Sequence, residues 1–261
     1  MTRSALAHTD QGSGRPLVLL HGFPLTRRMW DAEVHAWGPD WRVIAPDLRG
    51  FGETPLGDGE FTMQSCASDV GDLISALGIQ QKIVLLGLSM GGYIAFEFIR
   101  KYADRLYALV LVGTQPVADS DQAREGRYDT AEFVRREGTG ALAGRLIPRF
   151  LGKTTLETNP GVAEIVRGLI QSNSPEAIAR ACYGLAGRRD STPGLANIQI
   201  PTLIVAGAED ALMAPVQAET MNRQIPNSKL VVVERCGHLI NLEQPQALQY
   251  TVSQFLKSLP R

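Results

Sequence analysis

Short runs of valine, isoleucine and leucine alternate along this chain with segments that have the period of amphipathic helices. In a parallel β-sheet covered by helices, each strand is buried on both faces and reads as a continuous apolar run. The alternation therefore predicts an α/β fold, with a mostly parallel sheet flanked by helices. The predicted strands are residues 16–20, 42–45, 82–86, 106–112, 202–206 and 229–233, with a candidate edge strand at 5–9.

A stretch without strand signals, residues 116–195, interrupts this alternation. Its apolar side chains recur at helical spacing, so we expect several helices there. We expect residues 1–115 and 196–261 to form the sheet core, and residues 116–195 to be a helical lid inserted over the C-terminal edge of the sheet. A separate helical domain is the alternative. A lid would supply apolar side chains to a modest pocket, and the candidates are Leu142, Leu146, Ile147, Phe150 and Leu151.

The segment from Gly87 to Gly92 reads Gly-Leu-Ser-Met-Gly-Gly and lies between an apolar run, residues 83–86, and a helical pattern, residues 93–102. Small residues on both sides of a serine allow a strained strand-to-helix turn that projects the serine oxygen from the edge of the sheet. Gly-x-Ser-x-Gly also occurs in ordinary loops, but its place between strand and helix favours a nucleophile elbow. We therefore expect Ser89 to be a nucleophile.

Two backbone N–H groups are candidates for an oxyanion hole. The N–H of Met90 lies at the predicted start of a helix, where free N–H groups point at negative charge. The second donor should come from the loop after an earlier strand, and Phe23 lies in such a loop, directly after His21-Gly22. We expect the N–H groups of Phe23 and Met90 to stabilise a developing oxyanion.

A serine hydroxyl needs a base whose pKa lies near 7, and the chain has four histidines. His8 and His35 lie in segments where packing or surface roles are expected. His238 follows the strand at 229–233, so the edge of the sheet would bring it to the elbow. We expect His238 to be the general base; His21 competes for this role, but we expect it to be structural.

The imidazole needs a carboxylate to fix its tautomer and to stabilise its protonated form. Asp210 follows the strand at 202–206 and precedes His238, and we expect it to be this carboxylate. Its neighbour Glu209 is the immediate rival. Asp47 and Arg49 would also suit catalysis by their chemistry alone, but we expect them to form an internal ion pair that holds a glycine-rich turn.

Five motifs follow one another in the chain: residues 21–24, 47–52, the elbow, residues 207–210, and Gly237-His238 with Glu243 and Pro245. In this order they resemble the α/β-hydrolase superfamily, in its branch of small lidded serine esterases and enol-lactone hydrolases. The resemblance covers nearly the whole chain. It implies a carboxylesterase-like serine hydrolase that cleaves esters of short to medium acyl chain through an acyl-enzyme, without a metal or organic cofactor. The alternatives are an enol-lactone hydrolase similar to 3-oxoadipate enol-lactonases, and a ligand receptor of this fold with negligible turnover.

The charged residues and the cysteines indicate which binding partners and which cellular compartment to expect. The formal net charge is -1 and the basic residues are scattered, which does not indicate a nucleic-acid partner. The start of the chain lacks the apolar core of a signal peptide, and no apolar run has the about 20 residues of a membrane helix. Three widely spaced cysteines, Cys66, Cys182 and Cys236, are expected to be reduced thiols. We expect a cytoplasmic protein that acts on a small-molecule ester or lactone; a homo-oligomer is left open.

Overall fold

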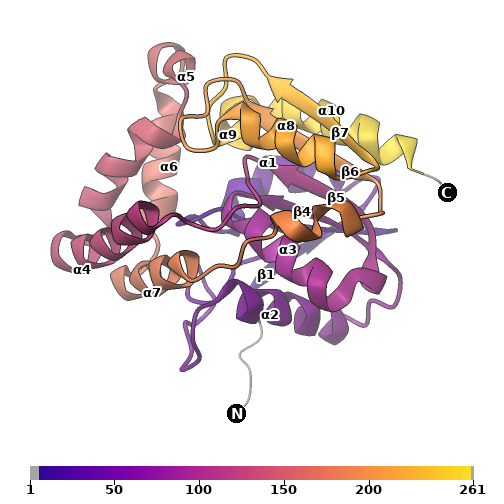
Figure 1. Ribbon diagram of the computed structural model, residues 1–261, viewed down its shortest axis with the longest axis horizontal. Coiled ribbons are helices and arrows are strands. Elements are labelled where there is room, and N and C mark those ends of the chain that lie inside the picture. The colour runs from indigo at the N-terminus through magenta and orange to yellow at the C-terminus, as the bar shows by residue number, and fades with distance from the viewer. Residues whose placement is uncertain (1–5, 260–261) are drawn as a thin grey trace.

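A seven-stranded sheet forms the centre of the molecule in the computed structural model, within residues 6–259, which are the residues that the structure describes (Figure 1). The strand order is β1-β3-β2-β4-β5-β6-β7. Every neighbouring pair is parallel except β1 and β3. The predicted α/β fold with a mostly parallel sheet is thus confirmed. The strands are β1 (His8–Gln11), β2 (Pro16–Leu20), β3 (Arg42–Pro46), β4 (Ile83–Leu88), β5 (Leu106–Val112), β6 (Thr202–Gly207) and β7 (Ser228–Val233).

The edge strand β1 begins later than predicted. We expected a strand at residues 5–9, whereas β1 runs from His8 to Gln11, and Ala5 lies outside the described residues. The strand is polar and partly exposed, and it is held by antiparallel pairing with β3 and by an ion pair between Asp10 and Arg42 at 2.7 Å. The position of β1 is therefore set by its pairing with β3. The spacing of apolar residues in the sequence gives no sign of this pairing.

Two layers of helices cover the sheet, because alternate residues of each strand point to opposite faces. Val18 and Leu20 of β2 belong to one apolar core, shared with α2, α3 and α8. Leu17 and Leu19 belong to the other, shared with α1 and α10. The helices of these layers are α1 (Asp31–Trp37), α2 (Met63–Ala76), α3 (Met90–Tyr102), α8 (Pro215–Gln224) and α10 (Pro245–Ser258), with the short α9 (Ile240–Glu243) and the 3-10 turns η1 (Arg27–Trp30), η2 (Ala103–Arg105) and η3 (Thr192–Asn197).

Four helices lie between β5 and β6, and Figure 1 shows them grouped at the left of the view. They are α4 (Asp121–Phe150), α5 (Lys153–Thr158), α6 (Gly161–Gln171) and α7 (Pro175–Ala186). α4 packs against α6 and α7 and is broken at Gly138, whose φ of 81° and ψ of 173° lie outside the helical region. No helix in the described part of the chain is long and apolar enough to cross a membrane.

Candidate active site

Ser89 lies in the turn between β4 and α3 with φ 54° and ψ -112°, a left-handed backbone that a residue with a side chain rarely adopts. The turn is possible only because glycines flank it. A Cβ at Gly87 would overlap the backbone of Gly91, and a Cβ at Gly91 would overlap the carbonyl of Leu20 on the neighbouring strand. The sequence Gly-Leu-Ser-Met-Gly therefore forms the tight strand-to-helix turn that it predicts.

The end of β5 fixes this turn. The N–H of Ser89 donates to the carbonyl of Val112 at 2.9 Å, and the hydroxyl of Thr114 donates to the carbonyl of Ser89 at 2.9 Å. Both backbone polar groups of Ser89 are thus bonded to the neighbouring strand and the loop that follows it. These two hydrogen bonds stabilise the strained backbone of Ser89 and so fix the direction of its side chain.

Asp210 and His238 come together through a hydrogen bond of 2.8 Å between Oδ2 and Nδ1, and both side chains are buried. The other oxygen of Asp210 accepts the N–H groups of Leu212 at 2.8 Å and Met213 at 2.9 Å. A carboxylate in this position keeps the proton of the imidazole on Nδ1, which leaves Nε2 as an acceptor. This is the arrangement that a general base requires.

The rival carboxylate, Glu209, points elsewhere. Its Oε2 accepts the N–H of Thr154 at 2.8 Å, and Oε1 accepts the hydroxyl of the same residue at 2.5 Å. These bonds lower the pKa of Glu209. Of the two neighbouring acids, the structure brings only Asp210 into hydrogen-bond contact with His238.

Ser89 and His238 both line a cavity of about 350 Å³, together with Phe23 and Met90. All four come from loops at the C-terminal ends of β2, β4 and β7, which is where open parallel sheets bind ligands. Among residues 6–259, no hydrogen bond joins the Ser89 hydroxyl to His238. Such bonds are often long in sites without substrate and tighten when substrate binds.

The backbone N–H groups of Phe23 and Met90, two residues that line this cavity, have no partner among the described residues. Met90 is the first residue of α3, so its N–H has no partner within the helix. Neither this N–H nor that of Phe23 donates to another of the described residues. The structure therefore brings together all five residues that the sequence singles out.

His21 is engaged through both ring nitrogens. Nδ1 contacts the carbonyl of Gly22 at 3.0 Å, and Nε2 accepts the N–H of Leu48 at 3.0 Å. The ring is completely buried, and burial lowers the pKa of His21. It thus ties the loop of Phe23 to the loop after β3, a structural role, and offers no free nitrogen to a substrate.

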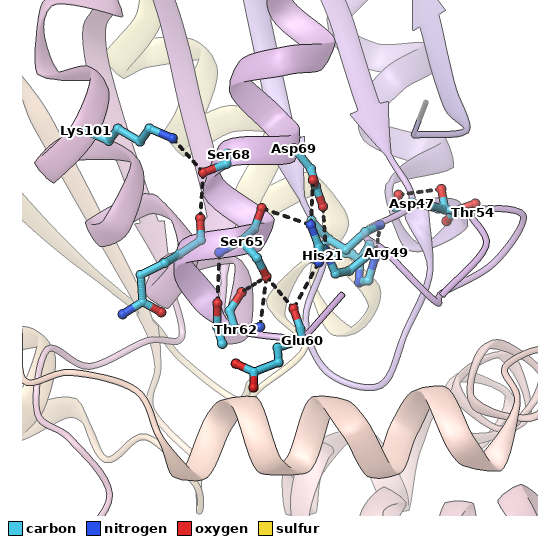
Figure 2. A network of polar contacts seen from close by, with 12 residues as sticks. His21, Asp47, Arg49, Thr54, Glu60, Thr62, Ser65, Ser68, Asp69 and Lys101 are labelled. Atoms are coloured by element: carbon cyan, nitrogen blue, oxygen red, sulfur yellow. Dashed lines mark hydrogen bonds and ion pairs between the residues drawn. The ribbon is translucent and has the colours of Figure 1, made fainter. Parts of the chain in front are cut away.

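The predicted ion pair between Asp47 and Arg49 is wrong, because each residue pairs with a different partner. Asp47 pairs with Arg27 of η1, whose backbone N–H also donates to it at 2.7 Å. Arg49 pairs with Asp69 of α2 at 2.6 Å (Figure 2). Arg27 and Asp69 lie about 20 residues away from the turn in the sequence. Because Asp47 and Arg49 are only two residues apart, their spacing suggested the wrong ion pair.

Many of the residues that line the cavity come from α4. Leu146 and Phe150 line the cavity, as expected. Leu142, Ile147 and Leu151 are packed into the apolar cores instead, because only one face of α4 meets the cavity. Polar residues that sequence reasoning missed also line it: Gln115, Asp119, Gln122, Arg127 and Arg149. Helical spacing alone did not show which of them would face the site.

Known proteins are similar to this chain over most of its length. The sequence model of the alpha/beta hydrolase fold family matches residues 15–245. The structure of a thermophilic esterase from Thermogutta terrifontis, with malate bound, has a TM-score of 0.94 at 45% identity, covering 97% of this chain and 93% of that one.

Two enol-lactonases are also similar. The crystal structure of the enol-lactonase from Burkholderia xenovorans LB400 has a TM-score of 0.89 at 27% identity, over 97% and 96% of the two chains. The 3-oxoadipate enol-lactonase 1 of Acinetobacter baylyi is 30% identical, over 88% of this chain and 84% of that protein. The family match, together with the parallel sheet and the serine turn, shows that this chain belongs to the α/β-hydrolase fold family.

Proposed function

We propose that this hydrolase cleaves carboxylic esters of short to medium acyl chain through an acyl-enzyme on Ser89. One observation carries the proposal. His238, which is hydrogen-bonded to Asp210, lines the same cavity as Ser89, Phe23 and Met90, and the N–H groups of Phe23 and Met90 have no partner among the described residues. Nucleophile, base, orienting acid and oxyanion donors are the parts that acyl transfer needs.

In the first half of the proposed reaction, Ser89 Oγ attacks the ester carbonyl while His238 Nε2 takes its proton. The carbonyl oxygen becomes an oxyanion that accepts the N–H groups of Phe23 and Met90; removing one such donor typically costs about 100-fold or more in rate. The oxyanion then collapses to a carbonyl, the bond between the acyl carbon and the alcohol oxygen breaks, and His238 gives its proton to that oxygen as the alcohol leaves. Asp210 stabilises the positive imidazolium in between.

In the second half, water replaces the alcohol. His238 takes a proton from the water, whose oxygen attacks the acyl carbonyl and forms a second oxyanion in the same place. The ester bond to Ser89 breaks, Ser89 Oγ regains a proton from His238, and the carboxylic acid leaves. The same five residues serve both halves.

Cavity size and lining support short or medium acyl groups. A volume of about 350 Å³ is small for a ligand pocket, and Leu146, Phe150 and Leu185 give it an apolar side. We also propose that the helices α4–α7 act as the lid expected at residues 116–195. The support is that residues of α4 and α7 line the same cavity as Ser89.

The test is a series of p-nitrophenyl esters of rising acyl length, with steady-state turnover measured for wild type and Ser89→Ala. We expect turnover that is greatest for short and medium chains and is abolished by Ser89→Ala. Ser258→Ala, an exposed serine of α10, is the matched control and should keep full activity. Unchanged activity in Ser89→Ala would refute the mechanism, and one burst of product without turnover would favour the ligand receptor.

A second candidate, hydrolysis of an enol-lactone that carries a carboxylate, is favoured by the charges on the cavity wall. Arg127 and Arg149 line the cavity, and Asp119 is the acid among the lining residues. Arg127 is paired with Asp119 at 3.1 Å, whereas Arg149 is exposed and has no ion-pair partner among the described residues. A carboxylate on the substrate would find a free cation there.

Pairs of esters that differ only in a terminal carboxylate separate the two candidates. For a carboxylate substrate, Arg149→Gln should raise KM for the anionic ester and leave the neutral ester unaffected, since only the former loses an ion pair. Arg136→Gln, an exposed arginine of α4 outside the cavity lining, is the control. Equal effects of Arg149→Gln on both esters would remove the second candidate and leave the first.

The proposal includes a small-molecule substrate and a cytoplasmic location. The support for the latter is that Cys66, Cys182 and Cys236 are free thiols, as is usual in a reducing compartment.

A further inference from the structure

Glu243 has a buried carboxylate that the proposed reaction does not use. It lies at the end of α9, and 7% of the residue is exposed. Oε2 accepts the N–H of Gly152 at 2.7 Å, the hydroxyl of Thr155 at 2.7 Å and the N–H of Gly237 at 3.0 Å. Oε1 accepts the N–H of Leu239 at 3.0 Å. Four hydrogen bonds from neutral donors therefore take the place of water around this carboxylate.

Two of these donors flank His238. The N–H groups of Gly237 and Leu239 both end on Glu243, and the N–H of His238 itself donates to the carbonyl of Phe150 at 2.8 Å. Three successive N–H groups of the histidine loop are thus fixed. Phe150 also stacks on the imidazole, with ring centroids 5.8 Å apart and an interplanar angle of 29°. The backbone that carries the imidazole is set by Glu243 and by the end of α4.

The other two donors belong to the start of α5. Gly152 and Thr155 bond to Glu243, and between them Thr154 bonds to Glu209, the neighbour of Asp210. The chains approach so closely that a Cβ at Gly237 would overlap the backbone N–H of Gly152. The loops of Asp210 and of His238 are therefore both tied to one short segment, residues 150–155, that joins α4 to α5.

We propose that Glu243 is a positioning residue: its carboxylate holds the loop of His238 in place against the start of α5, and so couples the geometry of the histidine to the helices between β5 and β6. The inference rests on the proposed function of His238. It follows from the four bonds, because Oε2 accepts from donors of both segments at once and Oε1 accepts from Leu239 on the far side of His238. An amide at this position has one oxygen and one NH₂ group, which would face N–H donors.

Glu243→Gln tests this directly, since it keeps the size of the side chain and removes half of its acceptor capacity. We expect kcat per active site to fall by about 100-fold, as for a displacement of about 1 Å in a catalytic group. KM should change little, because the cavity lining stays in place. The concentration of active sites is measured by burst titration, so that a loss of folded protein does not count as a loss of kcat.

Glu157→Gln is the matched control, because it makes the same change from acid to amide on the exposed side of α5, where Glu157 pairs with Lys153 of the same helix. It should keep the wild-type kcat. If Glu243→Gln does not fold, Glu243→Asp, which keeps the charge but is one methylene shorter, should show the same loss of kcat with little change in KM. If the variant that folds keeps the wild-type kcat per active site, Glu243 is not a positioning residue. The proposed function would still hold in that case, provided that ester turnover depends on Ser89. Absence of turnover in the wild type would instead refute the proposed function.

Discussion

The buried carboxyl group of Glu33 on α1 should make the stability of the fold depend on pH. Oε1 accepts a hydrogen bond from Gln249 of α10 at 3.2 Å, while Oε2 has no partner among the described residues. Burial raises the pKa of Glu33 from 4.5 to about 7. The folded protein therefore binds a proton that the unfolded chain releases at lower pH.

The sign and size of the effect follow from this shift. Because the folded pKa lies above the unfolded one, the stabilisation is fully present below pH 4.5 and is lost as the pH rises through about 7. A difference of roughly 2.5 pKa units corresponds to about 3 kcal/mol of unfolding free energy. Glu33→Gln keeps the shape but cannot ionise. It should be more stable than wild type at pH 9 by about 3 kcal/mol, and much closer to it at pH 5.

Urea unfolding at pH 5 and pH 9, followed by tryptophan fluorescence, measures this difference. Glu125→Gln, an exposed glutamate of α4, serves as the control and should unfold like wild type at both pH values. A stability difference between Glu33→Gln and wild type that is equal at pH 5 and pH 9 would refute the reasoning. It would mean that Glu33 titrates alike in the folded and unfolded chain.

Further predictions concern the histidines and the thiols. Asp210→Asn should lower kcat by about 10⁴, because the imidazole loses its orienting acceptor; a steady-state rate within tenfold of wild type would contradict that role. His21→Ala leaves the buried N–H of Leu48 without its acceptor and should cost about 1–3 kcal/mol in urea unfolding, so unchanged stability would count against the structural role. Burial raises the pKa of Cys66 and of Cys182 to about 12, so both thiols should react with a disulfide reagent at pH 8 only after unfolding; fast reaction of the native protein would disprove their burial.

Local chemistry made the sheet and the serine turn predictable. Buried parallel strands are continuous apolar runs, and the turn at Ser89 needs glycine at position 87 because a Cβ there would overlap the backbone of Gly91 in the same turn. What sequence did not reveal depends on partners far along the chain. Asp47 meets Arg27 across a loop, and polar β1 becomes a strand only by pairing with β3.

In the candidate site, too, some features were predictable from the sequence and others depend on contacts between distant segments. The serine turn was predictable from its motif, and the contact between Asp210 and His238 from their places after neighbouring strands. The four bonds of Glu243 depend on the approach of residues 150–155 to the histidine loop, which no sequence pattern describes. Side chains on α4 share a helical period, so the period did not separate those that line the cavity from those in the cores.

The break at Gly138 divides α4 into two pieces, and both of them contribute residues to the cavity lining. The first piece carries Gln122 and Arg127 on the cavity wall, whereas the second ends at Phe150, which is bonded to His238. Gly138 has a positive φ, which ends the helical run between the two pieces. Under the proposed function, substitutions in the first piece would change the cavity lining at a distance along the chain from Phe150, the residue that is bonded to His238. For protein engineering, residues 121–137 are therefore the stretch of α4 in which we expect substitutions to alter the cavity with the least effect on the position of His238.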